Sequence, residues 1–377
     1  MIEDFSDSAA LASHVAKLIE ACEQYSDEQK PARDTALEYY NGEMRDLPAE
    51  EGRSQVVSKD SRAVIKKLMP SIMRTLLSND KIVEYEPVEQ EDEARAEQAT
   101  DYINMVVVPE CGAEQAIYDA VFDALVLKTG ILKWTAYRRK HTRVKEWTDQ
   151  PPDALVGLEG DPDIEILEQV EKPVTDPDVL ALDPSAVCYD LTIRSVEERV
   201  ETRLEAVPRG AFLILPGSDS IEESPLVGER QLVTRSELVS RGYDKDEVYS
   251  LAAYDSKDEQ ESDDISRQGE DWSDIEAQTS KAMEEVQLYE VYARLDLDKD
   301  GIAELYKICM AERGSDDVTK HAILSMEAVS EAPYAEVVAE REAHQFEGHS
   351  VAEDVNDIQR IKTALLRATL DNTYWQN

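Results

Sequence analysis

The spacing of apolar residues divides the chain into helical and strand-forming parts. Up to residue 127 these residues recur mostly at helical intervals, whereas alternating and short apolar segments indicate strands farther along. Helical spacing returns at the C-terminal end. Helices and strands that are segregated in this way predict an α+β fold. The predicted helices of the first part are Ser8–Glu23, Asp27–Met44, Asp60–Leu77, Glu91–Val106 and Glu114–Leu127.

Glycine and proline indicate where several of these elements end or bend. Asn41-Gly42 is a typical helix stop, and Pro70 should kink or restart the helix that contains it. After a break at Lys128-Thr129-Gly130, the strands Ile131–Arg138 and His141–Trp147 are predicted to form a tight hairpin with a basic turn. The other predicted strands are Lys81–Pro87, Ile164–Val170, Ala186–Tyr189, Val200–Ala206, Val286–Arg294 and Ile302–Cys309.

Three capping boxes predict where later helices begin. In each, a Ser, Thr or Asp is followed by Glu at the position where the two side chains can satisfy free backbone N–H groups. Between the second and third boxes, Asp255–Glu276 is crowded with acid and has few apolar anchors, so we expect it to be mobile. The boxes are Thr234 with Glu237, Asp244 with Glu247 and Ser350 with Glu353, and the first two predict helices over Arg235–Arg241 and Lys245–Ala253.

The C-terminal helix carries an apolar stripe with little chain after it to cover that stripe. We expect the stripe to pack partly on earlier helices of the same chain and partly against another subunit or sequence beyond this chain. If Leu365 is buried in this way, Leu365→Ala should cost on the order of 2–5 kcal/mol of stability. The stripe consists of Val355, Ile358, Ile361, Leu365 and Leu370.

The net charge limits what the chain can bind. Its 40 basic and 82 acidic residues give a formal charge of −42, which repels phosphate and argues against a conventional nucleic-acid clamp. One stretch, YRRKHTRVKEW, reverses the sign locally. Contact with phosphate is possible there, but in so acidic a chain an acidic protein neighbour is the favoured interpretation. The cations assigned to subunit or DNA contact are Arg138, Arg139, Lys140, Arg143 and Lys145.

The stretch LDLDKDGIAEL is the most site-like motif. Asp296, Asp298 and Asp300, followed by Gly301, match the opening of a calcium loop, in which alternate carboxylates converge on one cation. At the position where such a loop needs a bidentate Glu, the chain has Lys307. A β-hairpin turn at Asp300-Gly301 is therefore the favoured interpretation, and a metal site is the alternative.

The sequence contains no motif typical of catalysis. The histidines are isolated or wrongly spaced for a helical metal site, and no phosphate-binding glycine loop or nucleophile elbow is present. The 4 cysteines are far apart and include no Cys-x-x-Cys pair, which argues against a disulfide framework. No apolar segment is long enough for a membrane span. We therefore expect a non-enzymatic protein with no cofactor and no membrane contact.

Four separated blocks, spread over nearly the whole chain, carry a resemblance to a known family. They are ALEYYNGEM with SRAVIKKLMPSIMRTLLSNDKIVEYEP, PRGAFLI with TRSELVSRGYDKDEVYSL, YARLDLDKDGIAELYKI, and GHSVAEDVNDIQRIKTALLRATLDN. In this order they resemble portal proteins of short-tailed double-stranded DNA bacteriophages, the head-to-tail connectors. Such portals continue past the last helix with more wing, tunnel-loop and crown sequence. The resemblance therefore implies a truncated or an unusually short chain.

The resemblance implies a dodecameric ring at one capsid vertex, present in the virion and assembled in the host cytoplasm. The implied partners are the terminase large subunit, a tail adaptor, capsid and scaffolding proteins, and double-stranded DNA that passes while weakly bound. An acidic cytoplasmic scaffold or adaptor without a channel is the alternative. By analogy, the regions are a helical wing with a basic hairpin (1–148), an Asp/Pro-rich loop and β region (149–233), stem helices with an acidic mobile segment (234–285), a clip-like β-hairpin with a return segment (286–347) and a capped wing helix (348–377).

Overall fold

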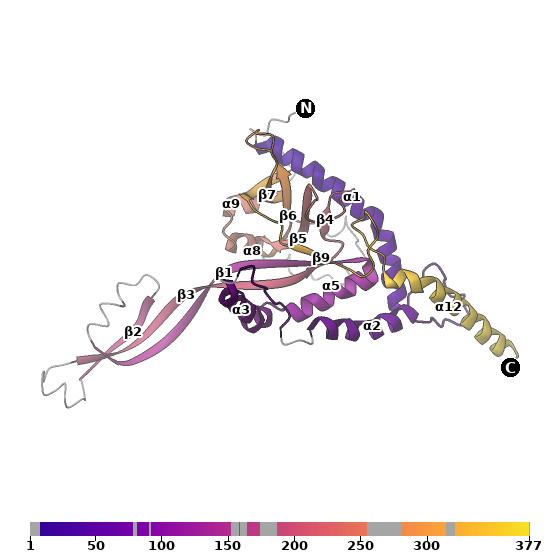
Figure 1. Cartoon of the computed structure of the whole chain (residues 1–377), viewed down its shortest axis with the longest axis horizontal. Coiled ribbons are helices and arrows are strands. Elements are labelled where there is room, and N and C mark those ends of the chain that lie inside the picture. Colours follow the sequence, from indigo (N-terminus) through magenta and orange to yellow (C-terminus); the bar gives the residue numbers. More distant parts are fainter. Residues whose placement is uncertain are drawn as a thin grey trace. The chain divides into compact units, whose positions relative to one another are not determined.

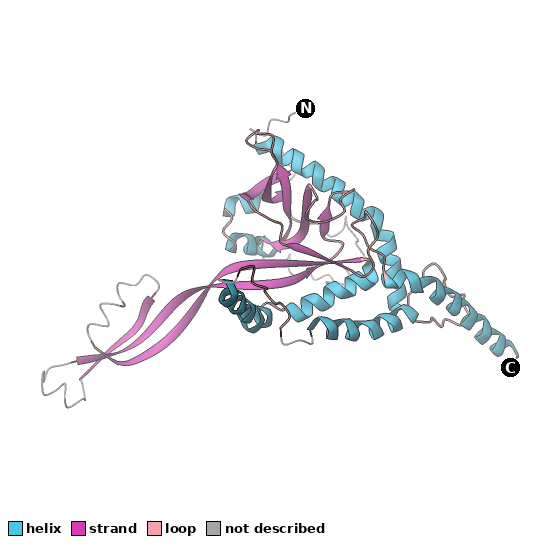
Figure 2. Cartoon of the chain, viewed as in Figure 1, coloured by secondary structure: helices cyan, strands magenta, loops and turns pink. Residues whose placement is uncertain are grey.

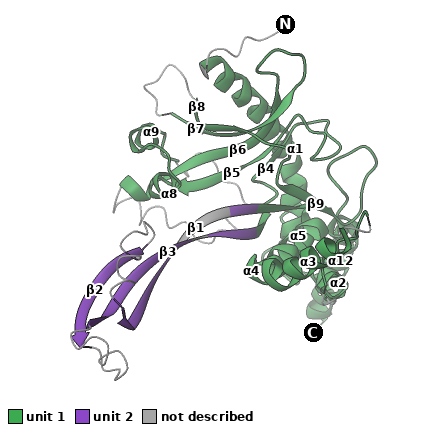
Figure 3. Ribbon diagram, turned by 60° about the vertical axis from the view of Figure 1, so that its left-hand side comes forward, with its two compact units in different colours: residues 1–134, 204–377 green, residues 135–203 purple. Residues whose placement is uncertain are grey.

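The computed structural model is a mixed α+β structure, as the sequence predicts (Figures 1 and 2). The chain forms two compact units (Figure 3): unit 1 is Met1–Trp134 with Leu204–Asn377, and unit 2 is Thr135–Arg203. The division into wing, stem and clip stays a prediction. The structure describes residues 8–77, 81–89, 92–151, 158, 164–173, 187–254, 281–313 and 321–376, without the side chains of residues 8, 137–140 and 198.

One long helix, α1 (Ser8–Asn41), replaces the predicted pair Ser8–Glu23 and Asp27–Met44. No glycine or proline lies between the two predicted segments, so nothing there breaks the helix. Ser26, at the predicted break, is buried, and its hydroxyl and carbonyl oxygens accept hydrogen bonds from Arg33 at 3.0 and 2.9 Å. The predicted stop is confirmed, since Gly42 follows the helix with φ of 82°.

Helix α2 (Asp60–Leu77) continues through Pro70, so it does not restart there, and the alternative prediction of a kink stays a prediction. Met69 lies just before the proline and Met73 one turn after it. Both pack in one apolar cluster with residues of α5 (Ala113–Leu127), which confirms the helix predicted over Glu114–Leu127. Because the turns on both sides of Pro70 are held by this packing, the helix tolerates the missing N–H.

The segment Lys81–Pro87 forms no strand, although its alternation predicts one. Instead Asn104 takes the place of a neighbouring strand: its side chain accepts from the Val83 N–H at 3.2 Å and donates to the Val83 carbonyl at 2.7 Å. Asn104 lies in a π-helical turn. The elements here are α3 (Glu93–Tyr102), the turn η2 (Ile103–Val107) and α4 (Val108–Glu110), which together cover most of the helix predicted over Glu91–Val106.

The first sheet has the strand order β2-β3-β1-β9. Its strand β1 (Thr129–Gln150) is continuous, so the predicted hairpin of Ile131–Arg138 and His141–Trp147 is wrong. Its turn would have needed a residue that favours positive φ, and Arg139 and Lys140 do not. The other strands are β2 (Ile164–Pro173), β3 (Val187–Val207), which merges the predicted strands Ala186–Tyr189 and Val200–Ala206, and β9 (Tyr334–Val338).

The second sheet is antiparallel throughout and lies in unit 1. Its strands β6 and β7 confirm the strands predicted over Val286–Arg294 and Ile302–Cys309. In sheet order, the strands are β4 (Phe212–Ile214), β5 (Leu226–Thr234), β6 (Glu285–Leu295), β7 (Glu304–Glu312) and β8 (His321–Ala328).

Strand β6 is buried on both of its faces. Tyr289 and Val291 belong to an apolar cluster with Val15 and Ile19 of α1, which lies along one face of the second sheet (Figure 1). The alternate residues, such as Leu288 and Tyr292, join clusters on the opposite face. Strand alternation thus places the second sheet between two apolar layers.

Two short helices follow β5 at the predicted capping boxes. Thr234 accepts from the Glu237 N–H at 3.2 Å at the start of α8 (Arg235–Ser240). Asp244 accepts from the Glu247 N–H at 3.1 Å at the start of α9 (Lys245–Ser250). A 3-10 turn, η3 (Lys281–Met283), precedes β6. The predicted mobile segment Asp255–Glu276 lies outside the described residues. The last element is the helix α12 (Val351–Gln376).

Candidate functional site

The N-terminus of α12 is fixed by the capping box that the sequence predicts. The Ser350 hydroxyl accepts from the Glu353 N–H at 3.2 Å, and the Glu353 carboxylate accepts from the Ser350 N–H at 3.2 Å. Lys128, at the break before β1, approaches the same carboxylate at 3.2 Å. The direction in which α12 leaves the fold is therefore set by both backbone capping and an ion pair.

His349 makes this helix start sensitive to pH. A hydrogen bond from the ring to Asp354 at 3.0 Å raises the pKa of His349; slight burial opposes this, and the nearby Glu353 charge supports it. A raised folded-state pKa stabilises the fold below the ordinary value of 6.5, and this contribution is lost as the pH rises through the folded pKa. We expect a loss of about 0.5 kcal/mol or less between about pH 6 and 8.

The measurement is the thermal unfolding midpoint as a function of pH. In His349→Gln the part of the decline that belongs to this residue should disappear, because the amide does not titrate. Parallel curves for the wild type and the variant would contradict the assignment.

Beyond its first turn, where Ala352 packs in an apolar cluster with residues of α1, α2 and α5, the face of α12 that contacts its own chain is polar. Gln359 and Thr363 are fully buried. Gln359 donates to the Tyr39 carbonyl and accepts from the Ser61 N–H, both at 2.9 Å, and Thr363 accepts from the Ser58 N–H at 3.1 Å. These side chains satisfy backbone groups at the end of α1 and the start of α2. The sequence does not predict these contacts, because Gln and Thr in a helix are typical of a solvent-facing surface.

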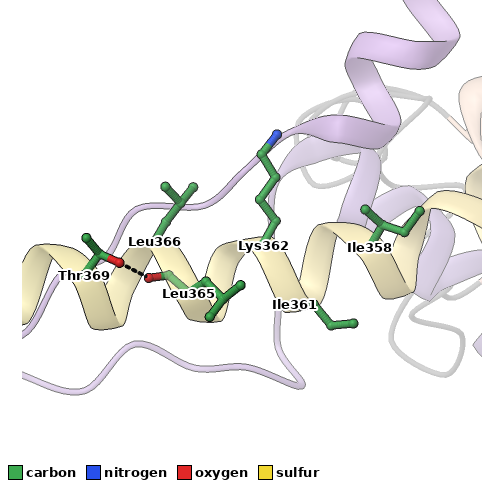
Figure 4. Close-up of a pocket in the computed structure, with 6 residues that line it drawn as sticks. All are labelled: Ile358, Ile361, Lys362, Leu365, Leu366 and Thr369. Atoms are coloured by element: carbon green, nitrogen blue, oxygen red, sulfur yellow. Dashed lines mark hydrogen bonds between the residues drawn. The ribbon is translucent and has the colours of Figure 1, made fainter.

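The apolar stripe of α12 is left open to solvent. Ile358, Ile361 and Leu365 are 61%, 62% and 63% exposed, and they line a shallow groove along the helix (Figure 4). Val355 and Leu370 are half-buried. The own-chain contact that was expected of the stripe is thus made by the neighbouring polar face. Within one chain, Leu365→Ala should cost far less than the 2–5 kcal/mol expected for a buried leucine. Contact of the stripe with another subunit stays a prediction.

The basic stretch lies on strand β1 in unit 2 instead of in a turn. Arg143 and Lys145 are exposed, and the side chains of Arg138, Arg139 and Lys140 lie outside the described part of the structure. The Arg199 side chain lowers the pKa of Glu197 on β3, and the charges of Arg143 and Lys145 add to this effect. The cations therefore form part of a charged ribbon, and their assignment to subunit or DNA contact stays a prediction.

The three aspartates of the β6–β7 turn lie together, with one carboxylate oxygen of each within 4.8 Å of the others. Each also accepts a backbone N–H within the turn: Asp296 from Gly301 at 3.1 Å, Asp298 from Asp300 at 3.2 Å and Asp300 from Ile302 at 2.7 Å. Gly301 has φ of 89°, as the hairpin interpretation requires. These bonds are those of a turn braced by its own side chains, and the metal site stays a prediction.

Unit 1 also contains a buried charge cluster that sequence analysis did not find. Lys133 of β1 forms ion pairs with Glu229 of β5 and, at 2.9 Å, with Glu290 of β6; all three are nearly fully buried. The two glutamates lie directly opposite each other in the β5–β6 pairing. Lys307 reaches Glu290 at 3.4 Å, and the Tyr292 hydroxyl donates to it at 3.0 Å.

The protonation of this cluster follows from its charges. Burial disfavours the charged form of Lys133, but Glu229 and Glu290 outweigh burial and raise the pKa of Lys133. Burial likewise opposes the Glu290 carboxylate, but Lys133 and Lys307 outweigh it and lower the pKa of Glu290. Lys133 and Glu290 are therefore both charged near neutral pH, and their ion pair joins the first sheet to the second.

One known protein family matches nearly the whole chain. The family model described as phage SU10 portal protein matches residues 11–377. The chain belongs to the phage SU10 portal protein family. A search of curated proteins finds no match to this portal protein. The resemblance drawn from the four sequence blocks is thus confirmed at the level of the family.

Membership implies an oligomeric, capsid-associated protein, and portal proteins are generally structural instead of enzymatic. Among the described residues, no helix of this portal protein is long and apolar enough to span a membrane. The α12 stripe and the charged ribbon of unit 2 are two surfaces of this portal protein that are exposed in the single chain.

Proposed function

We propose that the chain is the repeating subunit of a closed ring at one capsid vertex, through which DNA is packaged and later leaves the head. One observation carries this proposal beyond family membership: the exposed stripe of α12, on a helix that is already fixed to its own chain. An apolar surface of this kind marks a protein contact. A ring requires each subunit to use two different patches, and the stripe supplies one of them.

The charge of the chain suits a conduit for DNA. With a formal charge of −42, a ring of such subunits repels phosphate, so DNA should pass without being held tightly. The dodecameric state, the terminase large subunit and tail adaptor as docking partners, and contact with capsid and scaffolding proteins belong to this proposal by family likeness. Annular particles in negative stain would distinguish it from an acidic scaffold or adaptor without a channel.

The stripe is tested by Ile358→Ser combined with Leu365→Ser. Because both residues are exposed, we expect unfolding of the single chain to change by roughly 0.5 kcal/mol or less per site. Ring formation should fall strongly, because apolar area that becomes buried between subunits is removed. Negative-stain imaging and sedimentation velocity give the ring fraction, and denaturant unfolding gives the stability.

The matched control is Ala364→Ser with Ala368→Ser, which places two serines at exposed positions on the same helix. This control should keep its rings, since it leaves the stripe intact while costing the helix at least as much propensity as the stripe variant does, because alanine is the best helix former. Equal ring fractions in the stripe variant and the control would contradict the proposed contact. A wild-type protein that sediments as a monomer over a wide range of concentration and salt would contradict the proposed function.

A further inference from the structure

Unit 2 is a three-stranded ribbon with two open edges. Strand β3 lies in the middle, between β2 and β1 (Figure 3). The outer edge of β1 is paired with β9 only over Thr129–Lys133, and the Trp134 N–H still donates to the Pro333 carbonyl at 3.0 Å. Beyond Trp134, no described strand pairs with this edge, and none pairs with the outer edge of β2. Among the described residues, two rows of backbone N–H and C=O groups therefore have no strand partner.

The two edge strands carry opposite charge. Strand β1 has the cations Arg138, Arg139, Lys140, Arg143 and Lys145 over eight consecutive positions without an acid, as the sequence shows. Strand β2 has Glu165, Glu168 and Glu171, all exposed, and one cation, Lys172. In a chain of charge −42, a strand with this excess of basic residues departs from the composition of the rest.

The middle strand, β3, forms ion pairs with only some of these charged residues. On the β2 side, Arg194 pairs with Glu165 at 2.7 Å and Asp190 pairs with Lys172. On the β1 side, Glu201 pairs with His141 at 2.5 Å. Four exposed residues have no ion pair among the described side chains. They are Arg143 and Lys145 on β1, and Glu168 and Glu171 on β2.

Opposite signs on the two edges restrict which contacts are possible. Two β1 edges repel each other, and so do two β2 edges, so a two-fold symmetric contact through like edges is disfavoured. A β1 edge beside a β2 edge is attractive. Such a contact joins two different patches, and a pair of subunits joined in this way still has one free β1 edge and one free β2 edge. Further copies can add by the same contact until a ring closes.

The strand directions fit the same arrangement. The chain enters unit 2 on β1 and leaves it on β3, and β2 runs antiparallel to β3. Strands β1 and β2 therefore run in the same direction along the ribbon. Copies related by rotation about a ring axis point their ribbons in similar directions, so a β1 edge can lie beside the β2 edge of the next copy as a parallel pair.

We infer that the β1 edge of unit 2 docks beside the β2 edge of unit 2 in the adjacent copy of this chain, with Arg143 and Lys145 facing the acidic strand. This inference rests on the proposed ring. It adds a second subunit contact, on a different unit from the α12 stripe, and gives the basic residues a second copy of the chain as partner instead of DNA.

The test uses the full chain and two charge-reversed variants. One carries Arg143→Glu and Lys145→Glu on β1, and the other carries Glu168→Lys and Glu171→Lys on β2. Each should raise the concentration needed for half-assembly about ten-fold or more at low salt, with a smaller effect at high salt. The two variants change the net charge in opposite directions, so general repulsion between acidic chains would weaken assembly in the first and strengthen it in the second.

Two experiments that restore the opposite charges of the edges give the decisive result. A variant with all four substitutions restores opposite edges and should assemble like the wild type. An equimolar mixture of the two single-edge variants should also assemble, because each supplies the edge that the other needs. Circular dichroism and the unfolding midpoint verify that each variant is folded, and recovery in the mixture excludes misfolding as the cause of the loss.

The outcomes separate the edge contact from the ring itself. If wild-type rings form and the charge-reversed variants form them equally well, the edge contact is wrong and the ring stands. If both variants lose assembly but neither the mixture nor the four-site variant recovers it, the pairing between these two edges is wrong. If the wild type never forms rings, both the ring and the edge contact are wrong.

Discussion

Lys133→Met is expected to destabilise the folded chain by about 3–5 kcal/mol, the usual cost of leaving a buried charge without its partner. Lys133 is the central cation between Glu229 and Glu290, which face each other across β5 and β6. Without it, two buried carboxylates would repel each other with only Lys307 near one of them. Urea unfolding of the wild type and the variant at neutral pH measures the difference.

The same cluster sets a dependence on pH. The lowered pKa of Glu290 means that its contribution to stability is present above the ordinary carboxyl pKa and lost as the pH falls through the folded value. In Lys133→Met the effect of acid is the opposite, because protonation of a glutamate relieves the repulsion between the two carboxylates. The difference in unfolding free energy between the variant and the wild type should therefore shrink as the pH falls. Lys307→Met is the control, because Lys307 is partly exposed and forms an ion pair with Glu290 but not with Glu229 in the described structure. An equal loss in both variants would contradict the central role of Lys133.

Gly130→Ala is expected to destabilise unit 1 by about 3 kcal/mol or more, at the upper end of what overpacking costs. A Cβ atom at Gly130 would lie 1.9 Å from the backbone oxygen of Ala120 and 2.7 Å from its carbonyl carbon. Ala120 is fully buried in α5, so neither backbone can move away without opening the core. Denaturant unfolding measures the loss, and a lower yield of folded protein should accompany it.

Gly52→Ala separates this clash from backbone strain. Gly52 has φ of 80°, and a Cβ atom added there would meet no atom within 4 Å, so its substitution tests the left-handed backbone alone, at about 1 kcal/mol. Gly130 has an ordinary strand conformation, and its effect should come from contact with α5. A smaller loss for Gly130→Ala than for Gly52→Ala would show that β1 and α5 are not as closely packed as described.

Local signals in the sequence predicted the parts of the fold that depend on neighbouring residues. The caps at Thr234, Asp244 and Ser350 and the stop at Gly42 are confirmed, because capping and positive φ are decided within one turn of chain. The β6–β7 hairpin is confirmed for the same reason: Asp300-Gly301 is a local turn signal between two alternating segments.

Tertiary contacts decided the features that the sequence did not predict. The hairpin predicted within β1 is wrong because a strand can remain extended when β3 runs beside it, although each half looks like a complete strand. The break predicted in α1 is wrong because both halves are held in helical form by packing, in clusters around Ile19 and Ala36, and no glycine or proline lies between them. Lys133 and Gln359 gave no signal at all, since their partners are far away in the sequence.

In its middle turns, helix α12 reverses the usual arrangement of an amphipathic helix: Gln359 and Thr363 are buried, whereas Ile358, Ile361 and Leu365 are exposed. Its orientation is therefore established by directional bonds during the folding of the single chain. A partner that covers the aliphatic side meets a rigid template and does not bear the conformational entropy of ordering it. The same preorganisation leaves an apolar surface exposed on the isolated subunit, so folding of the subunit and its association are separate steps. Association should lower the heat capacity, because it removes apolar surface from water.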